Sequence, residues 1–421
     1  MDLDSRTSHK PPSSDGYQKK TVKPGLPKTE KAKGGQKGHV GKTLKRVERP
    51  DHIKVHLPEQ CVCCQRFFAS DETYEIVQSR QVFDLPEPKL IVIEHCLGQV
   101  ACCGLSQCGD YPPHVTAVVQ YGPGVRAFAT QLSVDYKMPL EQISQLFEDL
   151  YGYALNSATV EEALERAYAL AEPIEAQSVA QLKIADCAHF DETGLRVAGK
   201  LHWLHVAATA TLTHVFVHEK RGMAALTHEA SVLKDFHGVT VHDCWSPYFN
   251  FTSARHVLCG AHLLRELWGL RENGSAWAEA MHGFLLELHN MPRPVTDPEV
   301  VRLRYGAILD QADHAEPPPQ TGKRGKPKQS KGRNLLNRLR AHEDGVLAFA
   351  LEAGIPFTNN QAERDVRPAK VKQKVSGCFR TQAGAQVYAR IQAVISTFRK
   401  QNLKVFATLR DLFSSSFVLV A

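Results

Sequence analysis

The stretch from about residue 181 to residue 260 constrains the fold most, because runs typical of β-strands follow one another there with turn residues between them. The strand-like runs are KIADCAHFD, GLRVAGKLHWLHVAATAT, THVFVHEK, GVTVHDCW and RHVLC, and a helical run, GMAALTHEASVLKDF, precedes the fourth. Helical patterns flank this stretch on both sides. The prediction is a mixed β-sheet with helices packed on it, which is an α/β fold class.

Three consecutive strands, a helix and a further strand match the opening of an RNase H-like fold. Asp191 ends the first strand-like run, Asp243 ends the fourth, and Glu363 begins a later helix in NNQAERDVRPAKVKQK. In such a sheet the first and fourth strands are neighbours, so the two aspartates converge and a nearby helix can add the glutamate. Oxygen ligands in this arrangement suit two Mg²⁺ ions about 4 Å apart, which serve phosphoryl transfer.

Each of these acidic residues also has a plainer interpretation. A single aspartate at the end of a strand is usually a turn residue. With Asn360 as the N-cap, Glu363 would occupy the N3 position of a capping box and bond back to the backbone. Asp186 and Glu192 are near enough in the sequence to replace Asp191 as the ligand. The residues alone leave these alternatives open.

The first 50 residues form a basic arm with 13 Lys and Arg against 5 Asp and Glu, whereas the whole 421-residue chain has a net charge of +6. The arm lacks apolar periodicity, so it is expected to be disordered. A basic tail most often meets a polyanion such as DNA, and the alternative is a merely solvated arm. No apolar run reaches the ~18 residues of a membrane span, and no apolar signal segment is visible. A cytoplasmic location without a membrane partner is therefore predicted.

Eleven cysteines are present, and seven of them lie close together, at positions 61, 63, 64, 96, 102, 103 and 108. In a cytoplasmic chain such clustering favours a metal site over disulfides. Residues 51–113 also contain strand-like runs such as QVFDLPEPKLIVIEH, so a small zinc-ribbon-like domain is predicted there. Cys61 and Cys64 would form one half of a Zn²⁺ site, and Cys108 with Cys103, or with Cys102, the other half. The alternative is a small β domain whose cysteines are buried as hydrophobic side chains.

Helical patterns divide the rest of the chain. Residues 120–180 are helix-turn-helix-like, but their second helix carries Glu161, Glu162 and Glu165 against one arginine, a poor surface for phosphates, so a structural role is favoured. Residues 181–260 would form the first part of the RNase H-like catalytic core. Residues 261–340 would be a helical insertion with a basic linker. Residues 341–421 would complete the core with the helix that carries the glutamate.

Two further groups of residues accompany the acidic ones. Basic side chains that follow Glu363 would hold a scissile phosphate, or would form a plain solvated face: Arg364, Arg367, Lys370, Lys372 and Lys374. Cys259 and His262 form a Cys-x-x-His pair at a strand–helix junction. Because a zinc site needs four ligands and two are evident, a structural or active-site-shaping role is favoured over a metal site.

Seven strings occur in one order along the chain: KPPSSDG, GGQKGHVG, RQVFDLP, FDET, HDCWSPY, CGAHLLREL and NNQAER. In these strings the chain resembles the insertion sequence 66 family of bacterial DDE transposases, from about residue 10 onward. The resemblance implies that Asp191, Asp243 and Glu363 are the catalytic D, D and E, and that the spacing of 120 residues between the last two holds a helical insertion. It also implies that the cysteine-rich domain binds the DNA ends of the element.

By the same resemblance, the protein would cut DNA at the ends of an insertion sequence and join the freed 3′-OH to target DNA, with Mg²⁺ as cofactor. A homo-oligomer on DNA, accessory proteins encoded by the element and a nucleoid-associated location are expected. The family usually has a longer leucine-rich helical segment before KPPSSD, where this chain has about nine residues. We therefore expect the family's oligomerisation region to be missing or the reading frame to be truncated.

Two rival functions remain at this stage. One is a catalytically inactive or domesticated DNA-binding remnant of a transposase. The other is an RNase H-like nuclease that cleaves DNA without joining it.

Overall fold

The computed structural model describes residues 43–319 and 329–414. Two compact units divide the chain, one of them Gln18–Ile91 and the other containing Val92–Ala421. Most of the predicted basic arm, and most of the basic linker, lie outside the described residues. Among the helices within these ranges, none has both the length and the apolar character that crossing a membrane would demand.

The described part of the unit Gln18–Ile91 contains a tight turn around its cysteines. An antiparallel bridge joins Gln60 to Phe67. Inside it the Cys61 amide donates a hydrogen bond of 2.9 Å to the Arg66 carbonyl. The turn therefore fixes the backbone around Cys61 and Cys64 within this unit.

Fewer strands form in the cysteine-rich region than the sequence predicts. Residues 81–95, expected to contain strands, form none, and Val82 and Leu85 are exposed. An extended run without a neighbouring strand gains no ladder hydrogen bonds and covers no apolar face. In the other unit, β1 (Gln99–Cys102) and β2 (Leu105–Cys108) do pair, as a short antiparallel hairpin.

A group of helices precedes the main sheet and has its own small core. Ile143, Phe147 and Val160 are fully buried in this core, as the spacing of apolar residues predicts for amphipathic helices. The elements are α1 (Pro123–Thr130), the π-helical turn η2 (Gln131–Asp135), α2 (Leu140–Tyr151), α3 (Ser157–Leu170) and α4 (Glu172–Lys183).

The main sheet has five strands in the order β5-β4-β3-β6-β7. The strands are β3 (Cys187–Val197), β4 (Lys200–Ala208), β5 (Thr213–His218), β6 (Val239–His242) and β7 (Arg255–Leu258). The first three pair antiparallel, whereas β6 runs parallel to β3 and β7 runs parallel to β6. The predicted mixed sheet of an α/β protein is confirmed, and the first and fourth strands are neighbours as expected.

One strand boundary differs from the sequence prediction. The run GLRVAGKLHWLHVAATAT is not one strand but the end of β3, a two-residue turn and all of β4. Ala198 and Gly199 form the turn with φ of 47° and 76°, and both positive values match the twist of a tight hairpin. The predicted helix over residues 222–236 is also reduced, to α5 (Met223–Leu226) and the 3₁₀ turn η3 (Leu233–Asp235).

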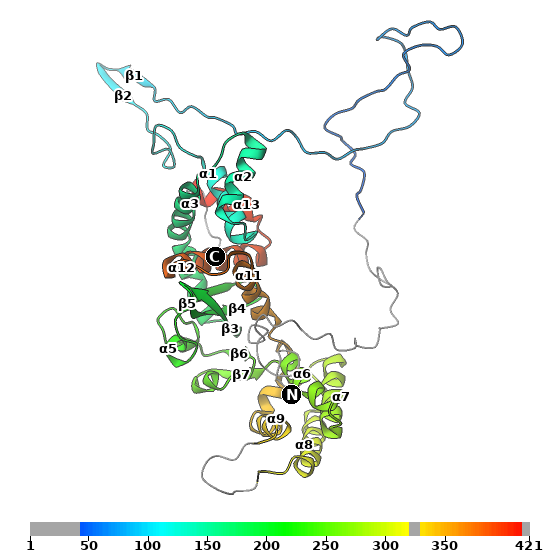
Figure 1. The fold of residues 1–421 in the computed structure, drawn as a ribbon, viewed down its shortest axis with the longest axis vertical. Helices are drawn as coiled ribbons and strands as arrows, with labels where there is room; N and C mark the ends of the chain where they lie inside the picture. The colour runs from blue at the N-terminus through cyan, green and yellow to red at the C-terminus, as the bar shows by residue number, and fades with distance from the viewer. Residues whose placement is uncertain (1–42, 320–328, 415–421) are drawn as a thin grey trace. The chain divides into compact units, whose positions relative to one another are not determined.

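Both faces of the sheet are covered. Helices α11 (Asn360–Ser376) and α12 (Gln382–Lys400) pack on one face, where Leu195, Val206 and Val215 join the largest hydrophobic core (Figure 1). The segment from α5 through the 3₁₀ turn η4 (Ser246–Asn250) covers the other face around Phe190. A last helix, α13 (Val405–Phe413), belongs to the first of these cores.

The chain between β7 and α11 is helical and builds a second large core. Its buried side chains include Trp277, Phe284 and Tyr305. The helices are α6 (Gly260–Arg271), α7 (Ala276–Asn290), α8 (Pro298–Ala315), α9 (Lys331–Ala341) and α10 (Glu343–Leu351). Ala348 of α10 packs on Val241 and Val257, so the helical segment is attached to the edge of the sheet.

Candidate active site

Asp191 lies within β3 rather than at its end, because the strand continues to Val197, the residue before the hairpin turn. Its register partner on β4 is Val206, which belongs to the core beneath α11 and α12. Since side chains alternate along a strand, Asp191 points to the face that these two helices cover. It is therefore not the turn residue of the plainer interpretation.

Asp243 follows β6 directly. The parallel register pairs Ala188 with Thr240 and His189 with Val241, and two further residues along both strands bring Asp191 level with Asp243. The chain turns sharply after this position, where Cys244 has a φ of 69°, a left-handed conformation that costs roughly 1–2 kcal/mol for a side chain other than glycine.

Backbone amides hold both aspartates. The Glu192 amide donates to Asp191 Oδ1 at 2.9 Å, and the Trp245 amide donates to Asp243 Oδ1 at 3.0 Å. Burial raises the pKa of Asp191 well above its usual range, and the carboxylates of Glu192, Asp243 and Glu363 raise it further. Burial and the nearby Glu192 raise the pKa of Asp243 to about 7. Carboxylates that repel one another in this way favour a cation between them.

Glu192 is the nearest alternative to Asp191 as a metal ligand, but both of its carboxylate oxygens already accept hydrogen bonds from protein groups. Its side chain lies on the opposite face of the sheet and is buried. Arg221 donates to Oε1 through Nε at 2.8 Å and through Nη2 at 2.5 Å, and the Tyr248 hydroxyl donates to Oε2 at 2.6 Å. Asp186 is exposed and precedes β3, about 16 Å from Asp191 along the strand. Of these three acidic residues, Asp191 is therefore the one with a carboxylate oxygen available to bind a metal ion.

Glu363 lies in the first turn of α11, and its helix position differs from the capping-box alternative. The N-cap is Asn359, not Asn360, so Glu363 comes one residue beyond the N3 position. Its Oε1 is buried and accepts no hydrogen bond from the described residues. Oε1 lies 3.6 Å from His262 Nδ1, and Oε2 lies 4.0 Å from Arg367 Nη2. No bond back to the helix backbone is present among the contacts of the described residues, so capping does not explain this side chain.

Asn359 fastens the beginning of α11 to β3. Its Nδ2 donates to the Phe190 carbonyl at 2.7 Å, and its Oδ1 lies 3.0 Å from His189 Nδ1. The side chain is 1% exposed, so neither bond competes with water. Asn359 thereby fixes the start of the helix beside the residue that precedes Asp191.

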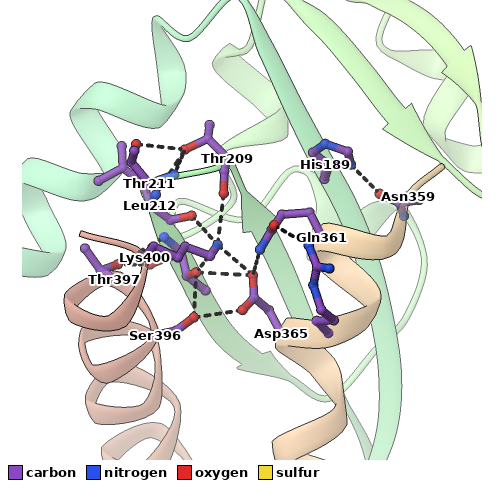
Figure 2. A network of polar contacts seen from close by, with 12 residues as sticks. His189, Thr209, Thr211, Leu212, Asn359, Gln361, Asp365, Ser396, Thr397 and Lys400 are labelled. Atoms are coloured by element: carbon purple, nitrogen blue, oxygen red, sulfur yellow. Dashed lines mark hydrogen bonds and ion pairs between the residues drawn. The ribbon is translucent and has the colours of Figure 1, made fainter. Parts of the chain in front are cut away.

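A second attachment of α11 is the buried polar network around Asp365 and Lys400 (Figure 2). Lys400 Nζ lies 2.8 Å from Asp365 Oδ2. Ser396 and Thr213 donate to the same carboxylate at 2.7 and 3.2 Å. The network ties α11 to α12 and to the start of β5, two residues beyond Glu363.

Cys259 and His262 lie beside the glutamate. Cys259 is the N-cap of α6, its Sγ accepts the Asn359 amide at 3.1 Å, and burial raises its pKa to about 11. Ligand atoms of Cys259, His262 and Glu363 all lie within 4.8 Å of one another. They are the one such group of three potential metal ligands in residues 43–319 and 329–414. The sequence showed two of these residues together and missed the third.

The basic residues of α11 have unequal surroundings. Arg364, Arg367 and Lys374 are exposed, and Arg367 is on the same helical face as Glu363 despite Pro368. Lys370 Nζ donates to the Gly194 carbonyl, and Lys372 Nζ donates to the Ser133 carbonyl at 3.4 Å. Burial lowers the pKa of Lys370 to about 8 and also lowers that of Lys372.

The cysteines of the predicted zinc site belong to different units. Cys61 and Cys64 belong to the unit Gln18–Ile91, and Cys103 and Cys108 belong to the other. Cys108 ends β2, and Cys103 forms the hairpin turn with φ of 55°. Their pairing in one Zn²⁺ site stays a prediction.

Comparison with known proteins identifies the family of the chain. Residues 118–387 match the model of the Transposase IS66 family, and residues 1–45 match a family of unknown function, DUF6444. A comparison with curated proteins found no match. The first match contains all five strands of the main sheet and the three predicted carboxylates. Because it covers more than half of the 421 residues, the chain belongs to the IS66 family of transposases.

Proposed function

We propose that this protein is a DDE transposase that cuts DNA at the ends of an insertion sequence and joins the freed 3′-OH to target DNA. The observation that carries the proposal is the approach of three carboxylates from separate elements, Asp191 in β3, Asp243 after β6 and Glu363 in α11. The parallel register of β3 and β6 brings Asp191 level with Asp243, and the charges of Asp243 and Glu363 both raise the pKa of Asp191. The strand order, antiparallel then parallel, supports an RNase H-like core for this chemistry.

The donor set fits a pair of Mg²⁺ ions. Two mutually repelling carboxylates and a buried oxygen of Glu363 without a hydrogen-bond donor among the described residues form a set of hard oxygen ligands of the kind that Mg²⁺ prefers. Carboxylates that bind two ions about 4 Å apart need not touch one another. Asp191, Asp243 and Glu363 would hold the ions. When bound, Mg²⁺ activates the attacking oxygen and stabilises the leaving oxygen.

The chain's own groups have defined tasks in this proposal. The amides of Glu192 and Trp245 orient one oxygen of each aspartate and leave the other for a ligand. Asn359 keeps the first turn of α11 against β3. The exposed guanidinium groups of Arg364 and Arg367 can bind the phosphates on either side of the scissile bond. Orientation by groups that are already in place lowers the cost of reaching the transition state.

Binding of the DNA ends would involve other parts of the chain. The basic arm supplies sequence-independent attraction to phosphates. The cysteine-rich segment would recognise the ends, with Zn²⁺ held by Cys61, Cys64, Cys103 and Cys108. We include a homo-oligomer on DNA, and accessory proteins encoded by the element, in the same proposal.

The proposal is tested by Mg²⁺-dependent cleavage of DNA taken from the ends that flank this gene. The native chain should cut, whereas Glu363→Gln, Asp191→Asn and Asp243→Asn should bind the same DNA and fail to cut. Glu161→Gln is the matched control, because it makes the same change at an exposed position of α3. Strand joining is assayed separately, with precleaved ends and a circular target.

Each outcome assigns the function. Cleavage by Glu363→Gln at the native rate would remove this residue from the site. Cleavage without joining would support a nuclease that lacks transposase activity. DNA binding without cleavage by the native chain would support an inactive remnant.

A further inference from the structure

Two helices begin at one place in the fold, and the residues at their starts are Cys259, His262 and Glu363. Cys259 caps α6, His262 lies in its first turn, and Glu363 lies in the first turn of α11. Gly260 permits this approach, because a Cβ there would lie 2.1–2.7 Å from atoms of the Phe357 ring. The Gly260 amide also donates to the Phe357 carbonyl at 2.8 Å. The convergence is therefore built into the backbone.

The separations suit a single ion. With Zn–N and Zn–O bonds of about 2.1 Å, two ligands of a tetrahedral site lie about 3.4 Å apart. His262 Nδ1 and Glu363 Oε1 are 3.6 Å apart. The Cys259 sulfur lies within 4.8 Å of both partners, so a small rotation of its side chain would complete the set.

The surroundings orient the three ligands. Helices α6 and α11 both begin at this place, and the positive end of a helix dipole favours a negatively charged ligand. The Asn359 amide donates to Cys259 Sγ at 3.1 Å, and such a donor orients a ligating sulfur. Glu363 Oε1 is buried and accepts no hydrogen bond from the described residues, although a buried carboxylate oxygen normally has a donor.

We propose that Cys259, His262 and Glu363 bind one Zn²⁺ ion. Thiolate, imidazole and carboxylate together form a set typical of Zn²⁺ rather than of Mg²⁺. Cys259 and His262 are buried, whereas the Glu363 side chain is 19% exposed, so the fourth position opens beside the glutamate. A three-ligand site with an open position differs from the closed four-cysteine site predicted near the N-terminus. Because Glu363 is shared, Zn²⁺ at this site and Mg²⁺ at the proposed catalytic site are coupled.

The test uses Co²⁺ as a spectroscopic probe of the full chain. The seven cysteines between positions 61 and 108 are replaced by serine so that they contribute no signal; six are exposed and Cys61 is partly exposed, so the folded core should not change. We expect one thiolate-bound Co²⁺ per chain, with a charge-transfer band that Zn²⁺ abolishes by displacement. Cys259→Ala in this background should lose the band. The matched control Cys187→Ala, a partly buried cysteine of β3, should keep it.

A second variant covers the case in which Cys259→Ala does not fold. Glu363→Gln retains the thiol and the helix, and we expect it to weaken Co²⁺ binding at least tenfold. Absence of a thiolate band in the background chain would overturn the proposal, as would a band that persists in folded Cys259→Ala. Unchanged Co²⁺ affinity in Glu363→Gln would remove the third ligand and overturn it as stated.

The outcome does not depend on the proposed function. The double variant Asp191→Asn, Asp243→Asn lacks the proposed Mg²⁺ ligands of the sheet but keeps all three Zn²⁺ ligands. It should retain the Co²⁺ band and should not cut DNA. DNA cleavage is measured with the native cysteines in place, and the band in the cysteine-substituted chain. Cleavage without a band overturns the zinc site alone, and a band without cleavage overturns the transposase proposal alone.

Discussion

The buried ion pair between Lys400 and Asp365 allows the sharpest prediction about stability. The two side chains are 10% and 9% exposed. Lys400 Nζ also donates to the backbone carbonyls of Thr209 and Leu212, at 3.0 and 2.7 Å (Figure 2). Lys400→Met keeps the length of the side chain and removes its charge and all of these bonds.

The expected loss of stability follows from the buried Asp365 carboxylate that remains after the substitution. Removing one partner of a buried ion pair typically costs about 3–5 kcal/mol, because the other charge stays buried. Ser396 and Thr213 still donate to the Asp365 carboxylate, which moderates the loss. We therefore expect the free energy of unfolding to fall by about 3 kcal/mol.

Urea denaturation followed by tryptophan fluorescence measures this change, because all four tryptophans lie between residues 203 and 277 of the same unit. Lys183→Met is the matched control. Lys183 pairs with Asp235 at 2.6 Å, but these side chains are 30% and 48% exposed, so the loss should stay below about 1 kcal/mol. Adding Asp365→Leu to Lys400→Met should recover part of the loss. Equal effects of the two lysine substitutions would refute the reasoning.

Three further predictions concern single positions. Burial lowers the pKa of Lys137 to about 8, so between pH 8 and 10.5 the unfolded chain holds the extra proton. The stability of the native chain relative to Lys137→Met should therefore rise over this range in thermal melts, and a constant difference would contradict the assignment. Gly260→Ala forces a methyl group into the Phe357 ring and should cost about 1–3 kcal/mol in urea denaturation, whereas an unchanged midpoint would show that the ring can move. Arg367→Gln should reduce the slope of log affinity for end DNA against log salt by about 1. Lys370→Gln should leave that slope unchanged, because its ammonium group donates to a backbone carbonyl, and a reduced slope would show that it contacts DNA.

The order of the main strands could be predicted because each strand is encoded locally. Alternation of apolar side chains and turn residues located the strands, and the neighbouring positions of β3 and β6 followed from the expected fold. The place of Asp191 inside β3 was missed, because the turn at Ala198 and Gly199 lacks the Asn-Gly or Asp-Gly pair that usually marks a two-residue hairpin.

The contacts that support the candidate site could not be predicted from the sequence, for a different reason. Asn359 contacts His189 from 170 residues away, and no local pattern announces such a partner. The same holds for Glu363 and Cys259. They are far apart in the sequence, but their ligand atoms lie within 4.8 Å of each other. The capping alternative for Glu363 depended on a helix start that was one residue off, which is the ordinary uncertainty of a helix boundary.

The helical segment between β7 and α11 also delays the synthesis of Glu363 relative to that of the two aspartates. Asp191 and Asp243 leave the ribosome with the strands of the sheet, but Glu363 is made 120 residues after Asp243. At about 5–20 residues per second, this interval lasts roughly 6–24 s. During this time a growing chain has two of the proposed catalytic carboxylates and lacks the third. Under the proposed mechanism, interrupted translation would release fragments that cannot cut the chromosome.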